Sequence, residues 1–274
     1  MEITTTYVGT ATVLLTIGEL TILTDPVLDP AGSEYIGGVP VLGGTYKLRS
    51  TAGPALTADQ LPAIDLILLS HDEHEDNLDL AGRALLPTAT TVITTVSGAS
   101  RLGGNAVGLA PWQSHEVTQG ATRLKVTATP SRHGPEGVEP IMGDTVGFVL
   151  EAPDAQAAIY ISGDTVYHDA LDEIGRRFRI GTAFLHLGDA HFELGGDTRF
   201  SMNSEEAVAL ARSLDAHSVV PIHYDSWEHF AERPEAISTA FADAGLAERL
   251  QWLVPGTPHP LAWPTLTAST AAAL

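Results

Sequence analysis

The chain has 274 residues, 44% of them hydrophobic, which is enough for one large domain or two small ones. Its 14 basic and 34 acidic residues give a formal charge of −20, which argues against nucleic acid and anionic membranes because both are bound largely through Lys and Arg. The lack of cysteine excludes disulfides and thiolate metal ligands. We therefore expect a small-molecule substrate, no membrane or nucleic-acid partner, and a cytoplasmic protein without a signal peptide.

The first segments are rich in Thr, Val, Ile and Leu, which predicts strands at Ile3–Val8, Ala11–Ile17 and Leu20–Thr24. A stretch rich in Gly and Pro follows from Pro26 to Pro54, and its length is typical of a lid or binding loop. The pattern then predicts a strand at Ile64–Leu69, a helix at Leu78–Leu86 and a strand at Thr91–Thr95.

The second half repeats this alternation of strands and helices. Strands are expected at Leu124–Thr129, Thr145–Glu151, Ala158–Ser162, Ala183–Leu187 and Ser218–Pro221, and helices at Asp169–Phe178, Ser204–Leu214 and Pro234–Ala244. Asn203 and Glu206 form a capping-box pattern before the second of these helices. We expect one domain over residues 1–264, with two similar halves that meet near residues 120–130, and a flexible tail at 265–274.

Histidines and carboxylates follow four of the predicted strands. They are His71, His74 and Asp76 in "LLSHDEHEDNLD", His133 in "TPSRHGP", Asp164 in "YISGDT" and His223 in "VVPIHYDSW". Any one of them alone is more often an ordinary surface or core residue, as we expect for His115, His217 and His259. Four strands that are each followed by histidine or carboxylate side chains favour a common functional site, because strand ends gather on one edge of a sheet. Imidazole and carboxylate ligands suit zinc, iron or manganese.

The serial order of these residues resembles that of the metallo-β-lactamase fold superfamily. The opening "YVGTATVLLTIGELTILTDPVLDP" is similar to the branch that contains N-acylphosphatidylethanolamine phospholipase D and the ascorbate-6-phosphate lactonases, and the likeness runs from about Tyr7 to about Gly256. The resemblance implies an α/β (α+β) fold, an αββα sandwich of two mixed β-sheets with helices on the outer faces. It also implies one or two divalent metal ions, with zinc favoured over manganese or iron.

Carried over by position, the resemblance implies that His71, His74 and His133 hold the first ion. Asp76 and His223 would hold the second ion, with Asp164 between the two. Asp25, at the end of the third strand, would orient a ligand imidazole from behind.

Two departures from the family pattern H-x-H-x-D-H affect this ligand set. One extra residue separates His71 from His74, so which side chains of residues 72–75 face the metal stays open. Asn77 stands where the pattern ends in histidine, and a neutral amide is a poorer zinc ligand, so we expect the second position to be empty or weakly occupied. Thr10 also stands where many relatives of this branch have histidine.

The leading functional hypothesis is a metal-dependent hydrolase. A divalent ion lowers the pKa of bound water to about 7, and the resulting metal-bound hydroxide would attack a small ester, lactone, amide or phosphodiester. Asp76 would orient the hydroxide and pass on its proton. The alternatives are a single-iron oxidative enzyme on the same fold and a degenerate, non-catalytic metal-binding module.

Three segments are expected to surround the metals: Pro26–Pro54, His186–Glu193 and His223–Phe230. They carry aromatic residues suited to the walls of a small-molecule site, namely Tyr35, Tyr46, Phe192, Tyr224, Trp227 and Phe230. Trp227 and Phe230 could equally pack a closing helix. His186, His191 and His229 are candidate substrate contacts, and we assign His191 the catalytic role of protonating a leaving group.

Overall fold

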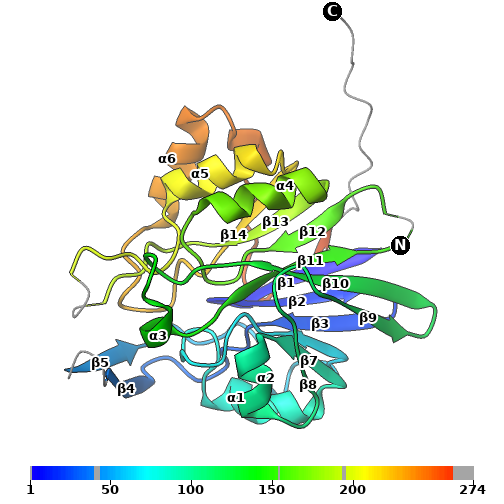
Figure 1. The fold of residues 1–274 in the computed structure, drawn as a ribbon, viewed down its shortest axis with the longest axis horizontal. Coiled ribbons are helices and arrows are strands. Elements are labelled where there is room, and N and C mark those ends of the chain that lie inside the picture. Colours follow the sequence, from blue (N-terminus) through cyan, green and yellow to red (C-terminus); the bar gives the residue numbers. More distant parts are fainter. Residues whose placement is uncertain (1, 40–43, 154, 193–195, 262–274) are drawn as a thin grey trace, which may run out of the picture.

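Two β-sheets lie face to face at the centre of the computed structural model, which describes residues 2–39, 44–153, 155–192 and 196–261 (Figure 1). The first sheet has the order β15–β1–β2–β3–β6–β7–β8. Its strands are β1 (Ile3–Gly9), β2 (Thr12–Ile17), β3 (Leu20–Thr24), β6 (Leu66–Leu68), β7 (Thr91–Thr94), β8 (Ala106–Gly108) and β15 (His259–Leu261).

The second sheet has the order β14–β13–β12–β11–β10–β9. Its strands are β9 (Ser114–Gln119), β10 (Thr122–Pro130), β11 (Val146–Glu151), β12 (Ala158–Ile161), β13 (Ile180–His186) and β14 (Ser218–Ile222). A separate hairpin, β4 (Glu34–Val39) and β5 (Gly44–Arg49), projects beside one end of the sheets (Figure 1).

Each sheet joins an antiparallel part to a parallel part. In the first sheet β3, β6, β7 and β8 run parallel, and in the second β12, β13 and β14 do. Two antiparallel steps separate β10 from β12, so β10 also points the same way as β12. Strands that run parallel bring their carboxyl ends to one edge, where the site residues follow them.

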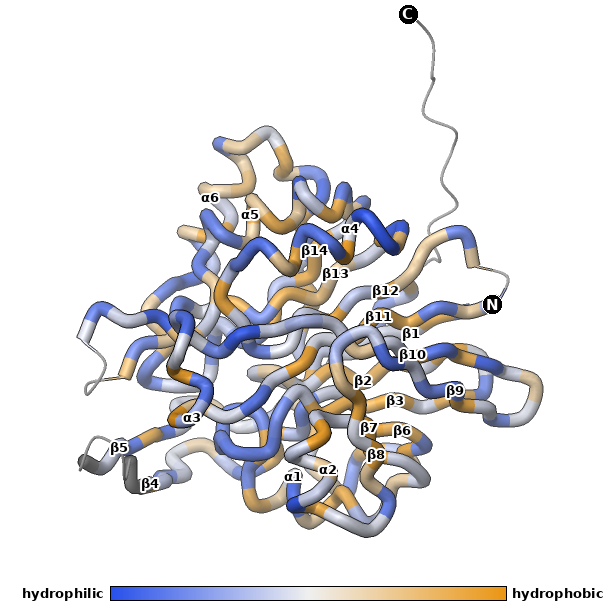
Figure 2. The backbone as a smooth tube through the Cα atoms, in the orientation of Figure 1, coloured by the Kyte–Doolittle hydropathy of each residue, from blue (hydrophilic) through white to orange (hydrophobic). Residues whose placement is uncertain are grey.

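The hydrophobic core lies between the two sheets and is set by the alternation of side chains along each strand. In β6, Leu66 and Leu68 face the main core together with Phe148 of β11, whereas Ile67 faces the opposite side. There Ile67 packs with Leu78 and Leu86, which flank the first helix. Hydrophobic residues accordingly follow the central strands, and hydrophilic ones follow the outer helices and turns (Figure 2).

Helices cover both outer faces, as the sandwich requires. Helices α4 (Asp172–Arg177), α5 (Ser204–Ser213) and α6 (Pro234–Asp243) lie over β12–β14, and α1 (Leu80–Leu85) and α2 (Val96–Leu102) lie on the side of β7 and β8; α3 is Glu139–Met142 (Figure 1). The expected αββα architecture is confirmed. No helix within the described ranges is long and apolar enough to cross a membrane.

The predicted strands and helices are all present, with ends that shift by at most three residues. The sequence pattern did not predict β4, β5, β8, β9, β15, α2 and α3. The segment Pro26–Pro54 thus contains a hairpin rather than only a loop. Asn203 caps α5 by accepting from the backbone nitrogen of Glu206, but the Glu206 carboxylate binds Tyr167 and Arg199 instead of closing the box. The predicted tail at 265–274 lies outside the described residues.

Candidate metal centre

Four loops bring the predicted ligands together at one edge of the sandwich. Each loop follows a strand of the described fold: β6 leads to His71, β10 to His133, β12 to Asp164 and β14 to His223. Two groups result, in each of which the possible ligand atoms lie within 4.8 Å of one another. We call His71, His74 and His133 the imidazole trio, and Asp76, Asp164 and His223 the carboxylate trio.

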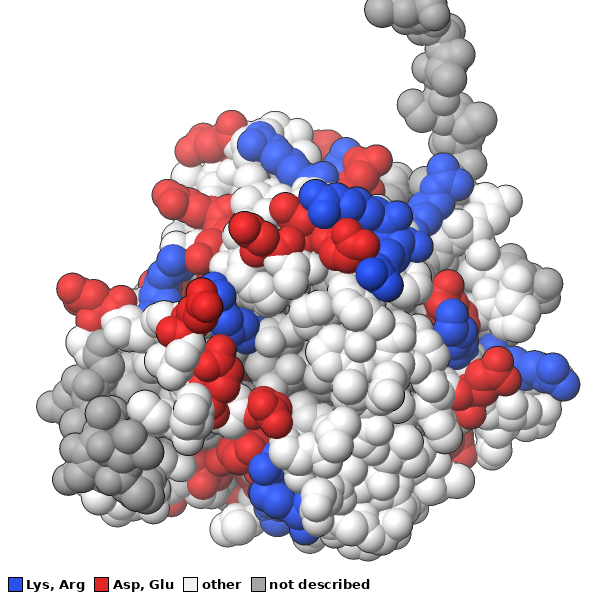
Figure 3. Space-filling model, in the orientation of Figure 1, with Lys and Arg blue, Asp and Glu red and all other residues white. Residues whose placement is uncertain are grey.

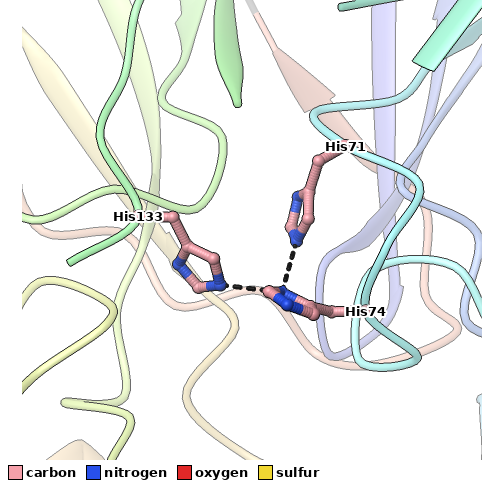
Figure 4. A group of neighbouring side chains, drawn as sticks. All are labelled: His71, His74 and His133. Carbon is pink, nitrogen blue, oxygen red and sulfur yellow. Dashed lines mark hydrogen bonds between the residues drawn. The ribbon is translucent and has the colours of Figure 1, made fainter. Parts of the chain in front are cut away.

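The imidazole trio has its ring nitrogens aimed at a common point (Figure 4). Nδ1 of His74 lies 3.0 Å from Nε2 of His71 and 2.9 Å from Nε2 of His133. Nδ1 of His133 donates to the carbonyl of Phe200 at 2.6 Å, which leaves its Nε2 with a lone pair. Three imidazole nitrogens at such spacing, two of them fixed as acceptors, repel one another unless a cation lies between them, so the trio fits a metal ion.

Burial keeps the imidazole trio neutral and ready to bind. Burial lowers the pKa of His74 to about 3 and that of His133 to about 4, and it lowers the pKa of His71 well below its ordinary value. The neighbouring imidazoles add to the shift for His71 and His74, because a second positive charge is unfavourable there. Neutral imidazole is the form that binds metal.

The carboxylate trio lies directly beside the imidazole trio. Oδ2 of Asp164 is 3.5 Å from Nδ1 of His133 and 3.7 Å from Nε2 of His223, so Asp164 stands between the two groups. Nε2 of His223 is also 3.5 Å from Oδ2 of Asp76. Nε2 of His223 and both oxygens of Asp164 are buried and make no hydrogen bond to any described residue. Buried polar groups without partners are costly, so these atoms also fit a cation.

The charges of the carboxylate trio are strongly coupled. Burial raises the pKa of Asp164 to about 6. Burial alone would lower the pKa of His223, but the Asp164 and Asp76 carboxylates outweigh it and raise that pKa to about 9. Burial would likewise raise the pKa of Asp76, but the neighbouring imidazoles of His223 and His229 hold it well below the usual range. A bound cation would take over the balancing charge that His223 supplies here, with release of a proton.

Asp25 acts on a ligand imidazole, but not by touching it. Its Oδ1 accepts from the backbone nitrogen and the hydroxyl of Ser70, at 2.7 and 2.8 Å, and the Ser70 hydroxyl lies 3.0 Å from Nδ1 of His71. Oδ2 of Asp25 instead meets Nε2 of His186 at 3.2 Å. The predicted support of a ligand by Asp25 therefore runs through Ser70.

The extra residue of the loop is accommodated by two acidic side chains that bind Arg101 instead of joining the imidazole trio. Asp72 and Glu73 both bind the guanidinium of Arg101, which comes from α2. The Tyr46 hydroxyl lies 3.5 Å from the carboxylate of Glu75. Of the side chains at residues 72–75 only His74 therefore joins the metal-binding group, which answers the question left open by the sequence.

The backbone is strained where the ligands meet it. His223 has a φ of 58°, a left-handed conformation rare for a residue with a side chain, and its backbone nitrogen donates to the carbonyl of Thr10 at 2.6 Å. Thr10 itself has a φ of 51°. Gly163, just before Asp164, has a φ of 63°, and a Cβ there would lie 2.3 Å from the carbonyl oxygen of Val146. Glycine is therefore required in "SGDT".

Aromatic residues from the three predicted segments pack into one cluster beside the ligands. Leu48, Ala190, Trp227 and Phe230 are buried in it, with Phe192 at its border. The ring of Phe230 lies 4.4 Å from that of His223, centroid to centroid. Trp227 and Phe230 sit in a loop rather than a helix, which excludes the closing-helix alternative. Tyr224 instead joins the main core, stacked on Tyr7.

The three candidate contact histidines differ in their surroundings. His186 is fully buried between Asp25 and Ser162, which makes it a positioning residue and not a substrate contact. His191 pairs with Asp189 at 3.2 Å, with 30% of its side chain exposed. His229 lies closest to the predicted ligands, because its Nε2 is 2.9 Å from Oδ2 of Asp76. The sequence carried no signal for this contact beyond the histidine itself.

One cavity lies away from these histidines. It has a volume of about 480 Å³ and is lined by Arg123 and Ala158 at the starts of β10 and β12, by Glu151 at the end of β11 and by Arg179 just before β13. His133 and Asp164 follow the opposite ends of those two strands. The cavity is therefore separate from the metal centre.

Residues 21–224 match the model of the β-lactamase superfamily domain, and this range spans most of the chain.

 The matched range thus includes every residue of the two trios, from His71 to His223. The chain belongs to this family. The match confirms the superfamily expected from the motifs, whereas the branch within it stays a prediction.

Relatives and solved structures agree with this assignment. A metal-dependent hydrolase from Exiguobacterium sp. is 26% identical over 246 residues, 88% of this chain and 94% of the relative. Another metal-dependent hydrolase, from Pelotomaculum thermopropionicum, is 29% identical over 201 residues, which cover 70% of this chain and 80% of the relative. The isothiocyanate hydrolase from Delia radicum gut bacteria has a similar fold, with a TM-score of 0.77 and 22% identity over 93% of this chain and 98% of its own.

The same fold also occurs in an enzyme of another class. The diiron β-hydroxylase CmlA from Streptomyces venezuelae has a TM-score of 0.65 and 16% identity, over 95% of this chain and 54% of its own. At such identity the likeness concerns the fold alone. Function therefore depends on the side chains of the site.

Proposed function

We propose that the protein is a metal-dependent hydrolase that acts on a small ester, lactone, amide or phosphodiester. The proposal rests on the convergence of the imidazoles of His71, His74 and His133. Nε2 of His71 and Nε2 of His133 are unprotonated and point to the same place. Relatives that bear the name of metal-dependent hydrolases support it. When bound, a divalent ion would supply positive charge and an activated water at neutral pH.

Asp76 is the residue best placed to handle the nucleophilic water. Its Oδ2 is held by Nε2 of His229 at 2.9 Å, whereas its Oδ1 is buried and accepts no hydrogen bond from any described residue. A carboxylate fixed on one side and open on the other can orient a water and accept its proton. We therefore keep Asp76 in the catalytic role inferred from the sequence.

The aromatic cluster supports a small-molecule substrate. Phe192 stacks against His229 with ring centroids 5.1 Å apart, and Phe230 lies against His223, so apolar rings border the carboxylate trio and the histidine that holds Asp76. Apolar walls with a few polar groups suit a small organic molecule. On the face shown in Figure 3, Lys and Arg are interspersed with Asp and Glu rather than joined into a basic groove. That mixed charge is poorly suited to a nucleic acid.

Oxidation by iron is the second candidate. The oxygen-rich carboxylate trio favours it, since iron accepts carboxylate ligands readily. Non-haem iron oxygenases, however, typically use two histidines and one carboxylate, and neither trio has that composition. Hydrolysis therefore ranks first. Elemental analysis of protein purified without chelator, combined with oxygen-uptake measurements, separates the two.

The test of hydrolysis starts from a screen of chromogenic lactones, esters, amides and phosphodiesters. Activity should disappear on treatment with a chelator and return on addition of zinc or manganese. A hydrolase rate that the chelator leaves unchanged would overturn the proposal. A protein that binds a divalent ion but hydrolyses none of these substrates would favour the non-catalytic metal-binding module.

A further inference from the structure

The cavity at the starts of β10 and β12 is lined in part by small side chains, which leave room for a ligand. Ala152, Ala157 and Ala158 are buried there, and the partly buried ring of Phe178 also lines it. The volume of about 480 Å³ falls within the range of about 300 to 1,000 Å³ that is typical of small-molecule sites. The cavity can therefore hold an organic molecule, and not only a small inorganic ion.

The charges around this cavity differ from those of the rest of the chain. Four of the 14 basic residues line it, and among the described residues only two of the 34 acidic ones do. These six residues carry a combined charge of +2, whereas the rest of the chain has 10 basic and 32 acidic residues. The charged residues that line the cavity are Glu116, Arg123, Lys125, Glu151, Arg177 and Arg179.

Strand alternation places two of these cations on the same face of the second sheet. Arg123 and Lys125 are exposed two residues apart in β10, and Leu124 between them is buried in the core. Lys125 lies opposite Glu116 of β9 and Glu151 of β11, and its ammonium is 3.0 Å from the Glu151 carboxylate. The two glutamates outweigh Lys125, so the excess of positive charge comes from the three arginines.

Arg177 is fixed in place by two contacts, while the cavity keeps further donors available. Its guanidinium carbon lies 4.2 Å from the centroid of the Trp112 ring, and its Nε is 3.0 Å from the Glu173 carboxylate. Its two terminal nitrogens donate to no described residue. Arg123 and Arg179 form no ion pair with a described residue. A guanidinium that is already fixed loses less conformational entropy when a ligand binds.

We propose that this cavity binds a small organic phosphomonoester. A phosphate monoester carries a charge of about −1.5 to −2 at neutral pH, which matches the local charge of +2. The planar fork of an arginine fits phosphate oxygens, and the organic part would lie against Phe178 and the alanines. The site is independent of the proposed hydrolysis, because it lies at the opposite ends of β10 and β12 from His133 and Asp164.

The acidic remainder of the protein limits the size of the ligand. Charges more than about 8 Å from a ligand inside the cavity are largely screened at physiological salt, so a small anion responds mainly to the nearby arginines. A nucleic acid or an anionic membrane would extend over the acidic remainder and be repelled by it. The charge distribution therefore favours a small phosphate compound over a polyanion.

Isothermal titration calorimetry of the full chain tests this with glucose 6-phosphate and adenosine 5′-monophosphate, and with glucose and adenosine as uncharged controls. Both phosphomonoesters should bind with a Kd below about 1 mM, and the controls should not bind. Arg123→Gln and Arg179→Gln should each lower the affinity about 10-fold, because each removes a charge-assisted hydrogen bond. Arg176→Gln is the matched control, since Arg176 lies on α4 but does not line the cavity, and its affinity should be unchanged.

The metal centre is the other place where a phosphate could bind, and His74→Ala separates the two sites. Binding should persist in that variant, with circular dichroism to confirm that each variant folds. Binding that is lost in His74→Ala but kept in both cavity variants would overturn the inference, and so would equal affinities of the three arginine variants or no binding at all. Tighter binding of an oligonucleotide or of phosphatidylserine vesicles than of either phosphomonoester would also overturn it.

Discussion

The carboxylate of Asp25 accepts both polar hydrogens of Ser70, from the backbone nitrogen at 2.7 Å and from the hydroxyl at 2.8 Å. Since the hydroxyl is committed as a donor, its oxygen accepts from Nδ1 of His71, and Nε2 of His71 keeps its lone pair. Asp25 thereby sets which nitrogen of His71 is protonated without contacting that ring.

Replacement of Asp25 should therefore weaken metal binding at the imidazole trio. With Asp25→Asn, the amide can donate to Ser70, which frees the hydroxyl to donate to Nδ1 of His71 and favours the wrong tautomer. We expect zinc affinity to fall about 10- to 100-fold, as for other supporting residues of metal sites. Competition with a chromophoric chelator measures the change. Asp65→Asn is the control, because Asp65 lies at the opposite end of β6, and an equal loss there would contradict the account.

The histidines of the chain should separate into ligands and bystanders. His74→Ala should remove the ion held by the imidazole trio, since Nδ1 of His74 faces both of the other rings. His217→Ala, at an exposed position, should leave metal content unchanged. Elemental analysis of both proteins decides. Equal metal content in the two variants would mean that the imidazole trio holds no ion.

His191 and His229 should have different effects on metal and on turnover. His191→Ala should lower turnover of a chromogenic substrate while leaving metal content intact, because His191 contacts Asp189 and not a predicted ligand. His229→Ala should lower occupancy of the carboxylate trio, because it removes the hydrogen bond that holds Asp76. Full activity of the His191 variant would remove that residue from the mechanism. Unchanged metal in the His229 variant would show that Asp76 needs no such support.

Arg101 should stabilise the lengthened ligand loop. Arg101→Ala leaves the buried carboxylate of Asp72 without its partner, and we expect a loss of about 1 to 2 kcal/mol in the free energy of unfolding. The lower end of the usual range applies because 44% of the Arg101 side chain is exposed. Urea denaturation measures the loss. Arg176→Ala, which breaks an exposed pair on α4, is the control and should cause no measurable change.

The sequence predicts the ligands best where they follow an obvious strand. His133, Asp164 and His223 each come just after a run of apolar or β-branched residues, so the direction of the strand places them at the common edge. The hairpin β4–β5 was missed because Gly37, Gly38 and Gly44 interrupt its strands, and glycine is depleted in strands. His229 could not be placed either, because it lies in an irregular loop whose path depends on packing with Phe192 and Trp227.

The left-handed backbone of His223 has a consequence for the order of assembly. Its nitrogen is tied to the Thr10 carbonyl, and the backbone of Ser70 is tied to Val146 of the other sheet, so the loops that carry the ligands are fixed by the polypeptide itself. Small zinc modules, in contrast, fold only when their ion arrives. This protein should therefore fold without metal and bind its ions afterwards. Its metal-free form should be stably folded and able to bind whichever suitable ion the cell supplies.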